Sequence, residues 1–202
     1  MIDFNTIITL ATTFFIITNP IGNSPAILAM LKDYPLERQR YIMMREGAIA
    51  LFMALFFQYF GEYFLGTLML QDYSIALCGG ILLFMIALSL IFPKREENEN
   101  VALKQEPFIV PIATPLLTGP GLLAMVMLNS RLIPSQLTLS LSLCVAWVAV
   151  GIVLYVTPYL KQILGKKGMI ALEQLMGMVL SMISMEMIVT GARLFATNMQ
   201  TQ

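Results

Sequence analysis

Residues 19–25 read NPIGNSP, and they lie within an apolar segment that extends over about residues 4–31. A second stretch, PLLTGPG at residues 115–121, interrupts another apolar segment at about residues 107–129. A proline inside a helix removes a hydrogen bond and costs roughly 3 kcal/mol. In a membrane, broken backbone is tolerated only where protein buries it or a wet cavity meets it. The two stretches therefore predict two broken helices whose breaks face protein or water rather than lipid.

The rest of the chain is dominated by apolar runs. Of the 202 residues, 58% are hydrophobic and 12% are charged, whereas soluble domains average about 25% charged residues. Runs of about 20 apolar residues match the length that a helix needs to cross the hydrocarbon core. We therefore expect an all-α polytopic membrane protein with a single membrane domain over residues 1–202. The six predicted transmembrane segments cover about residues 4–31, 42–60, 74–92, 107–129, 136–157 and 170–196.

Lysine and arginine are distributed unequally between the predicted loops. Ten of the twelve basic residues fall in the loops that follow the first, third and fifth segments, and the remaining loops keep Arg131 and Arg193. Because basic loops stay in the cytoplasm, both termini are expected in the periplasm, with the protein in the cell inner membrane. The ten residues are Lys32, Arg38, Arg40, Arg45, Lys94, Arg95, Lys104, Lys161, Lys166 and Lys167.

The chain is expected to consist of two related halves. Repeat one covers about residues 1–92, a polar linker covers residues 93–106, and repeat two covers about residues 107–202. Each half opens with a broken segment and closes with a similar stretch, ALCGGILL at residues 76–83 and ALEQLMGM at residues 171–178. Three helices per half is an odd number, so the second half must enter the membrane upside-down relative to the first. Such inverted repeats are the plan of many transporters.

Each break is expected to end in a helix N-cap. Ser24 before Pro25 is typical of an N-cap with proline at the first helical position. Thr118 or Gly119 before Pro120 offers the same arrangement. Two short half-helices are therefore expected, over about residues 25–32 and 120–129.

Inversion of the second half would bring the two half-helix N-termini together near the membrane midplane. Free N–H groups and the positive ends of two helix dipoles would then favour an anionic group, and breaks at matching positions indicate a binding site. The alternative is that both breaks are ordinary kinks that neighbouring helices repair. The candidate substrate-binding residues are Asn19, Pro20, Gly22, Asn23, Ser24, Thr118, Gly119 and Gly121.

Two carboxylates are predicted within or beside apolar segments. A charged carboxylate in hydrocarbon is costly, so Glu186 is expected to face the interior or to be protonated. Glu186 is a candidate for ion coupling; alternatively, it lies nearer the outer interface, where Thr190 or Arg193 reaches it. Arg45-Glu46, at the inner start of the second segment, is interpreted as an ion pair at the membrane edge, with a contact to a gate as the alternative.

Several motifs together resemble one known family. The matching stretches are residues 19–25, Arg45-Glu46, Gly61-Glu62, GGILLF at residues 79–84, residues 111–121 and residues 171–177. On these stretches, which extend over nearly the whole chain, the protein resembles the MarC family (the UPF0056 group), distantly related to the LysE-type exporters. The resemblance implies a six-helix inner-membrane protein. It also implies transport of small neutral amino acids, because archaeal members are described as transporters of these solutes.

A secondary transporter of small solutes is the function that these features indicate. A zwitterion would place its carboxylate at the half-helix N-termini and its ammonium near backbone carbonyls, Asn19, Asn23 or Glu186. No Gly-Lys-Ser/Thr sequence for binding nucleotide phosphates is present, so an ion gradient is expected to drive transport. The alternatives are a transporter of inorganic anions or lipid phosphates, and a membrane protein without cargo.

Other classes of function are disfavoured by composition. Histidine is absent, which removes the commonest general base and metal ligand, so we expect no enzyme, no metal site and no cofactor. The net charge is zero, which gives no general attraction to nucleic acid. The expected partners are a small-molecule substrate and the lipid bilayer, and the oligomeric state is left open.

Overall fold

The computed structural model describes residues 4–67, 69, 71–92, 108–109 and 112–200. Every secondary-structure element in these residues is a helix, as the apolar runs predict. The predicted linker at residues 93–106 lies outside the described residues. The elements are α1 (Phe4–Thr18), α2 (Pro20–Met30), α3 (Leu36–Thr67), α4 (Asp72–Ile91), the short π-helical turn η1 (Ile112–Leu117), α5 (Pro120–Leu132) and α6 (Gln136–Gln200).

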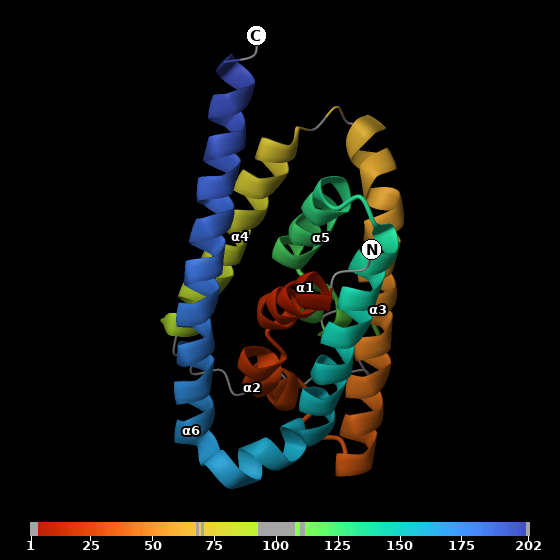
Figure 1. Ribbon diagram of the computed structural model, residues 1–202. Coiled ribbons are helices and arrows are strands. Elements are labelled where there is room, and N and C mark those ends of the chain that lie inside the picture. Colours follow the sequence, from red (N-terminus) through yellow and green to blue (C-terminus); the bar gives the residue numbers. More distant parts are fainter. Residues whose placement is uncertain (1–3, 68, 70, 93–107, 110–111, 201–202) are drawn as a thin grey trace.

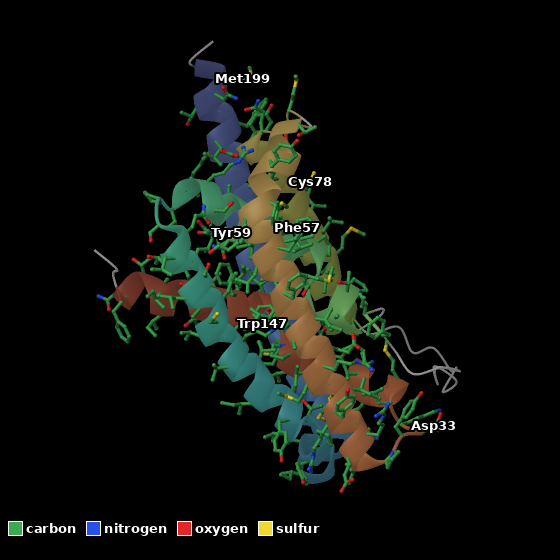
Figure 2. All side chains as sticks on the ribbon, turned by 90° about the vertical axis from the view of Figure 1, so that its right-hand side faces the viewer. Asp33, Phe57, Tyr59, Cys78, Trp147 and Met199 are labelled. Carbon is green, nitrogen blue, oxygen red and sulfur yellow. The ribbon has the colours of Figure 1, made fainter. Side chains whose placement is uncertain are left out.

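The long helices form two outer layers around the short ones (Figure 1). In one layer α4 lies beside the C-terminal part of α6, and in the other α3 lies beside the N-terminal part of α6. The short helices α1, α2 and α5 lie between the two layers. Figure 2 shows α1 lying crosswise to the long helices. The breaks that precede α2 and α5 are therefore held in the middle of the molecule.

A single glycine turns α6 back on itself (Figure 1). Gly165 has φ 63° and ψ −178°, a backbone conformation that glycine adopts without steric cost. It divides α6 into an N-terminal arm (136–164) and a C-terminal arm (166–200). The sequence predicts a loop between segments ending at 157 and starting at 170, but the chain remains helical on both sides of Gly165. The predicted loop is thus reduced to a sharp bend.

Small residues let α4 approach the C-terminal arm of α6 closely. A Cβ atom added at Gly80 would lie 3.0 Å from the Ser184 carbonyl oxygen and 3.0 Å from the Ile188 nitrogen. A Cβ atom added at Gly177 would lie 3.0 Å from the Ala87 carbonyl oxygen. Such a close approach of two backbones is typical of helix packing in membranes. There the hydrophobic effect does not drive helices together, and small residues allow close van der Waals packing instead.

Five helical stretches are long and apolar enough to cross a membrane among the described residues. The predicted segment at about 107–129 is not one of them, because its described part is divided into η1 and α5, which are short. The predicted count of six therefore rests on whether η1 and α5 together cross the bilayer. The five stretches are Phe4–Met30, Leu36–Gly61, Asp72–Ile91, Gln136–Tyr159 and Lys167–Met199.

Candidate functional site

The first break is built by Asn19 and Pro20. Asn19 has left-handed backbone angles, φ 49° and ψ 51°, and its side-chain Oδ1 accepts a hydrogen bond from the Gly22 N–H at 3.1 Å. Asparagine tolerates this conformation better than most residues, and Pro20 occupies the first helical position, where its missing N–H costs nothing. Helix α2 therefore begins at Pro20, not at Pro25 as the sequence predicts.

Ser24 is not an N-cap, which corrects the sequence prediction. It lies inside α2, where its hydroxyl donates to the Pro20 carbonyl at 2.7 Å and lies 3.0 Å from the Thr157 hydroxyl on α6. Pro25 follows it within the helix. Both Asn19-Pro20 and Ser24-Pro25 fit the capping pattern, and the structure uses the earlier pair.

The second break lies between η1 and α5. Gly119 is the N-cap of α5, Pro120 is its first residue, and no side chain caps the helix, in agreement with the predicted arrangement. Thr118 is buried, and its hydroxyl donates to the Ala50 carbonyl on α3 at 3.0 Å. The helix extends to Leu132, three residues beyond the predicted end.

Asn23 joins the two breaks. Its side-chain Nδ2 donates to the Thr18 carbonyl at 3.1 Å, at the end of α1, and to the Leu116 carbonyl at 2.8 Å, in η1. A carbonyl freed by a helix break needs such a partner when water is excluded. One amide group thus satisfies backbone from both halves of the chain.

The two breaks line one cavity of about 330 Å³. Of the eight predicted site residues, the structure places Asn19, Gly22, Asn23, Gly119 and Gly121 in its lining. Pro20, Ser24 and Thr118 are buried beside the breaks but do not line it. The other lining residues are Ile17, Ala26, Leu83, Ile86, Ser89, Leu90, Pro115, Leu116, Leu122, Glu173 and Leu180.

Residues that line this cavity bring hydrogen-bond donors from both breaks. Asn19 is 1% exposed, and its Nδ2 has no hydrogen-bond partner among the described residues. The first N–H groups of a helix have no acceptor within the helix, and α5 begins at the cavity with Gly121 and Leu122 and without a side-chain cap. Donors and a positive helix end together favour an anionic group of a ligand.

The carboxylate in the cavity lining is Glu173, not the predicted Glu186. Glu173 lies near the start of the C-terminal arm of α6 and is partly buried. Glu186 lies on an exposed side of the same arm and is not part of the lining. The signal for Glu173 was its position three residues inside an apolar segment, where an ionisable group is a candidate functional residue. Because Glu173 lies near the end of that segment, its carboxylate is equally compatible with a position at the membrane–water interface, and the sequence does not single it out.

Arg45 and Glu46 form an ion pair, with Arg45 Nη2 2.8 Å from Glu46 Oε1. The predicted ion pair is therefore present, and its carboxylate, on the Glu46 side chain, is completely buried. Its Oε2 has no hydrogen-bond partner in the described part of the chain. No group of three His, Cys, Asp or Glu side chains among the described residues could hold a metal ion.

Comparison with known proteins connects this chain to one family. The model of the MarC family integral membrane protein matches residues 4–195. The UPF0056 inner membrane protein YhgN of Escherichia coli K12 is 39% identical over 193 residues, which cover 95% of this chain and 98% of that protein. A UPF0056 membrane protein of Buchnera aphidicola from Schizaphis graminum is 37% identical over 195 residues, covering 96% of this chain and 100% of the relative. A third, from Chlamydia muridarum, is 29% identical over 179 residues, covering 87% of each. No solved structure matches the chain.

Proposed function

This chain belongs to the MarC family of integral membrane proteins, and from that premise we propose that it is a secondary transporter of small solutes, with small neutral amino acids as its cargo. The observation that carries the proposal is the cavity of about 330 Å³ between the two helix breaks. Ligand pockets range from about 300 to 1,000 Å³, so this cavity suits a small solute. Broken helices that meet at a cavity are the binding-site plan of many secondary transporters.

The chemistry of the lining suits a zwitterion. Its carboxylate would bind the Asn19 amide and the N–H groups of Gly121 and Leu122, which lie in the first turn of α5, where the helix has no side-chain cap. Its ammonium would bind the carboxylate of Glu173 and the side-chain oxygen of Asn23, both in the same lining. The lining contains a carboxylate but no lysine or arginine among the described residues, which disfavours an inorganic anion or a lipid phosphate as cargo.

The architecture that we propose has six spans arranged as two inverted three-helix repeats. In this arrangement η1 and α5 together form the fourth span, and the arms of α6 form the fifth and sixth. Both halves then run in the order broken helix, long helix, long helix, which supports the assignment. The distribution of lysine and arginine supports periplasmic termini, and the E. coli relative is named an inner membrane protein. Rocking of one half against the other would expose the cavity to each side in turn.

Uptake by purified protein tests the proposal. The full chain is reconstituted into proteoliposomes, and uptake of radiolabelled glycine, alanine and serine is measured under an imposed proton or sodium gradient. We expect uptake of at least one of these amino acids. Glu173→Gln should lower the uptake about tenfold or more, because an ammonium loses a charged partner worth about 1.5–3 kcal/mol.

Glu186→Gln is the matched control, since it changes a second carboxylate on the same helix outside the cavity lining. It should stay within about twofold of wild type if surface changes away from the site are nearly neutral. Equal loss in both variants would contradict the assignment of the ammonium site to Glu173. The proposed cargo would be overturned if none of the three amino acids shows uptake or counterflow under either gradient.

A further inference from the structure

A second hollow lies outside the proposed substrate site and is lined by α3 and the N-terminal arm of α6. Trp147 lies between these helices, and its Nε1 donates to the Gly47 carbonyl at 2.7 Å. Two adjoining pockets of about 280 and 370 Å³ lie over this contact. Because the pockets share Met44, Trp147, Val148 and Gly151, they form one continuous groove.

The groove is apolar and open along its length. Among its lining residues, Val148 is 66% exposed and Ile152 is 61% exposed. Gly151 supplies the hollow, because a Cβ atom added there would meet only Met44 Cε, at 3.7 Å. An exposed apolar groove on a membrane-spanning helix pair is covered by hydrocarbon rather than by water.

The length of the groove matches one leaflet of a bilayer. It runs from Cys144 to Val156 along α6, a rise of about 18 Å for an α-helix. The hydrocarbon core of a bilayer is about 30 Å thick, so one leaflet is about 15 Å. A single extended acyl chain therefore fits the groove from the membrane edge to the midplane.

A cation lies at the membrane-edge end of the groove. The Arg40 guanidinium carbon is 5.1 Å from the ring centre of Tyr155 and 4.4 Å from that of Tyr159. Arg40 is close to the start of the span Leu36–Gly61, and Tyr159 ends the span Gln136–Tyr159, so both belong at the headgroup level. The Nε of Arg40 is buried and has no hydrogen-bond partner among the described residues. An arginine presents a planar set of donors that suits phosphate.

We propose that this groove binds an anionic phospholipid, with one acyl chain along α3 and α6 and the headgroup phosphate on Arg40. Charge complementarity selects this occupant, because Tyr155 at the end of the apolar groove stacks against the positively charged guanidinium of Arg40. The basic residues Arg38, Arg40 and Arg45 also place this end on the side that the charge bias assigns to the cytoplasm. The site is separate from the cavity at the helix breaks and does not depend on what that cavity transports.

Native mass spectrometry of the full chain in detergent micelles tests the headgroup contact. Binding of dioleoyl-phosphatidylglycerol is compared with binding of dioleoyl-phosphatidylcholine, and the wild type is expected to retain the anionic lipid preferentially. Arg40→Gln should weaken that binding about fivefold or more, since an arginine near an anionic headgroup contributes about 1 kcal/mol. Arg38→Gln is the matched control, because Arg38 also stacks on a tyrosine, Tyr41 at 5.0 Å, but Tyr41 does not line the groove, whereas Tyr155 beside Arg40 does. Equal weakening by both variants would indicate a diffuse basic surface and would overturn the proposal.

A second pair of variants tests the acyl-chain contact with Arg40 left in place. Gly151→Leu should fill the groove and lower the retained phosphatidylglycerol several-fold, whereas Gly151→Ala, whose Cβ makes an ordinary contact, should keep it. Unfolding midpoints in lipid-free micelles identify any variant that is misfolded. Unchanged lipid retention in a folded Gly151→Leu protein would overturn the proposal. A dimer that this variant dissociates would also overturn it, since a second copy would then be the occupant.

Discussion

Each of the two helix breaks leaves backbone groups without helical hydrogen bonds, and the two breaks compensate for this differently. At the first break, the capping group is local: Asn19 takes a left-handed conformation, and its side chain accepts the Gly22 N–H three residues later. At the second break, Gly119 brings no capping side chain. There, Thr118 bonds to the Ala50 carbonyl on α3, and Asn23 on α2 bonds to the Leu116 carbonyl.

The first break is therefore stabilised by its own residues, and the second by residues of the neighbouring helices. A self-capped helix start needs little from the rest of the fold. An uncapped start leaves N–H donors free. Such donors destabilise an apolar core, but beside a ligand cavity they can bind the ligand. The second break therefore supplies binding capacity, and the first supplies the group, Asn23, that holds it in place.

The largest expected effect tests the link between the breaks. Asn23→Ala removes the donor shared by the Thr18 and Leu116 carbonyls, and each unsatisfied buried acceptor costs about 1–3 kcal/mol. We expect a loss of about 3 kcal/mol in the free energy of unfolding, measured by SDS titration in mixed micelles. Asn129→Ala is the control, because Asn129 is a buried asparagine whose amide donates within its own helix, to the Met125 carbonyl. A similar loss in both variants would contradict the linking role of Asn23.

An intermediate effect tests the self-capped break. Gly22→Ala would bring a Cβ atom within 2.3 Å of Asn19 Nδ2, so the cap must move, and losing an N-cap costs about 1–2 kcal/mol. The same unfolding measurement should show destabilisation of that size. In Gly151→Ala the new Cβ meets only an ordinary contact, so this helical substitution should be neutral or stabilising by up to about 1 kcal/mol. Stabilisation by both substitutions would show that the Asn19 cap contributes nothing.

The smallest expected effect tests the break that depends on its neighbours. Thr118→Val removes one hydroxyl hydrogen bond to the Ala50 carbonyl. Because that carbonyl can keep its bond within helix α3, the expected loss is about 1 kcal/mol. Thr118→Ser keeps the hydroxyl and should recover most of the stability in the same titration. If Thr118→Val costs more than Asn23→Ala, the ranking of the two contacts is wrong.

Much of the fold could be predicted from the sequence, because apolar run length and proline placement act locally. The start of α5 at Pro120 was predicted, since Pro120 has one capping pattern before it. The start of α2 was placed five residues too late, because Asn19-Pro20 and Ser24-Pro25 both fit the pattern. The spacing of residues does not indicate which of these two pairs will start the helix that packs against the second break.

The candidate site was predicted less completely. Asn19 and Asn23 could be selected because they are polar residues at a break in an apolar segment. The sequence favours Glu186 over Glu173, because a charge in the middle of an apolar run is the stronger indication of a functional residue. Which carboxylate lies at the cavity depends on how the C-terminal arm of α6 packs against α4, and Gly80 and Gly177 let these helices approach closely.

The amino-acid sequence alone is enough to predict that this protein is made of membrane-spanning helices and that two of its helical segments are broken. Those properties follow from the transfer of apolar side chains out of water and from the missing N–H of proline, which no fold can change. Two features become visible only when the whole chain is packed. The two breaks share one cavity, and the Asn23 amide donates to the carbonyl of Leu116, which is 93 residues away in sequence. Broken backbone must find partners wherever packing brings them, and local spacing carries no record of a partner so distant along the chain.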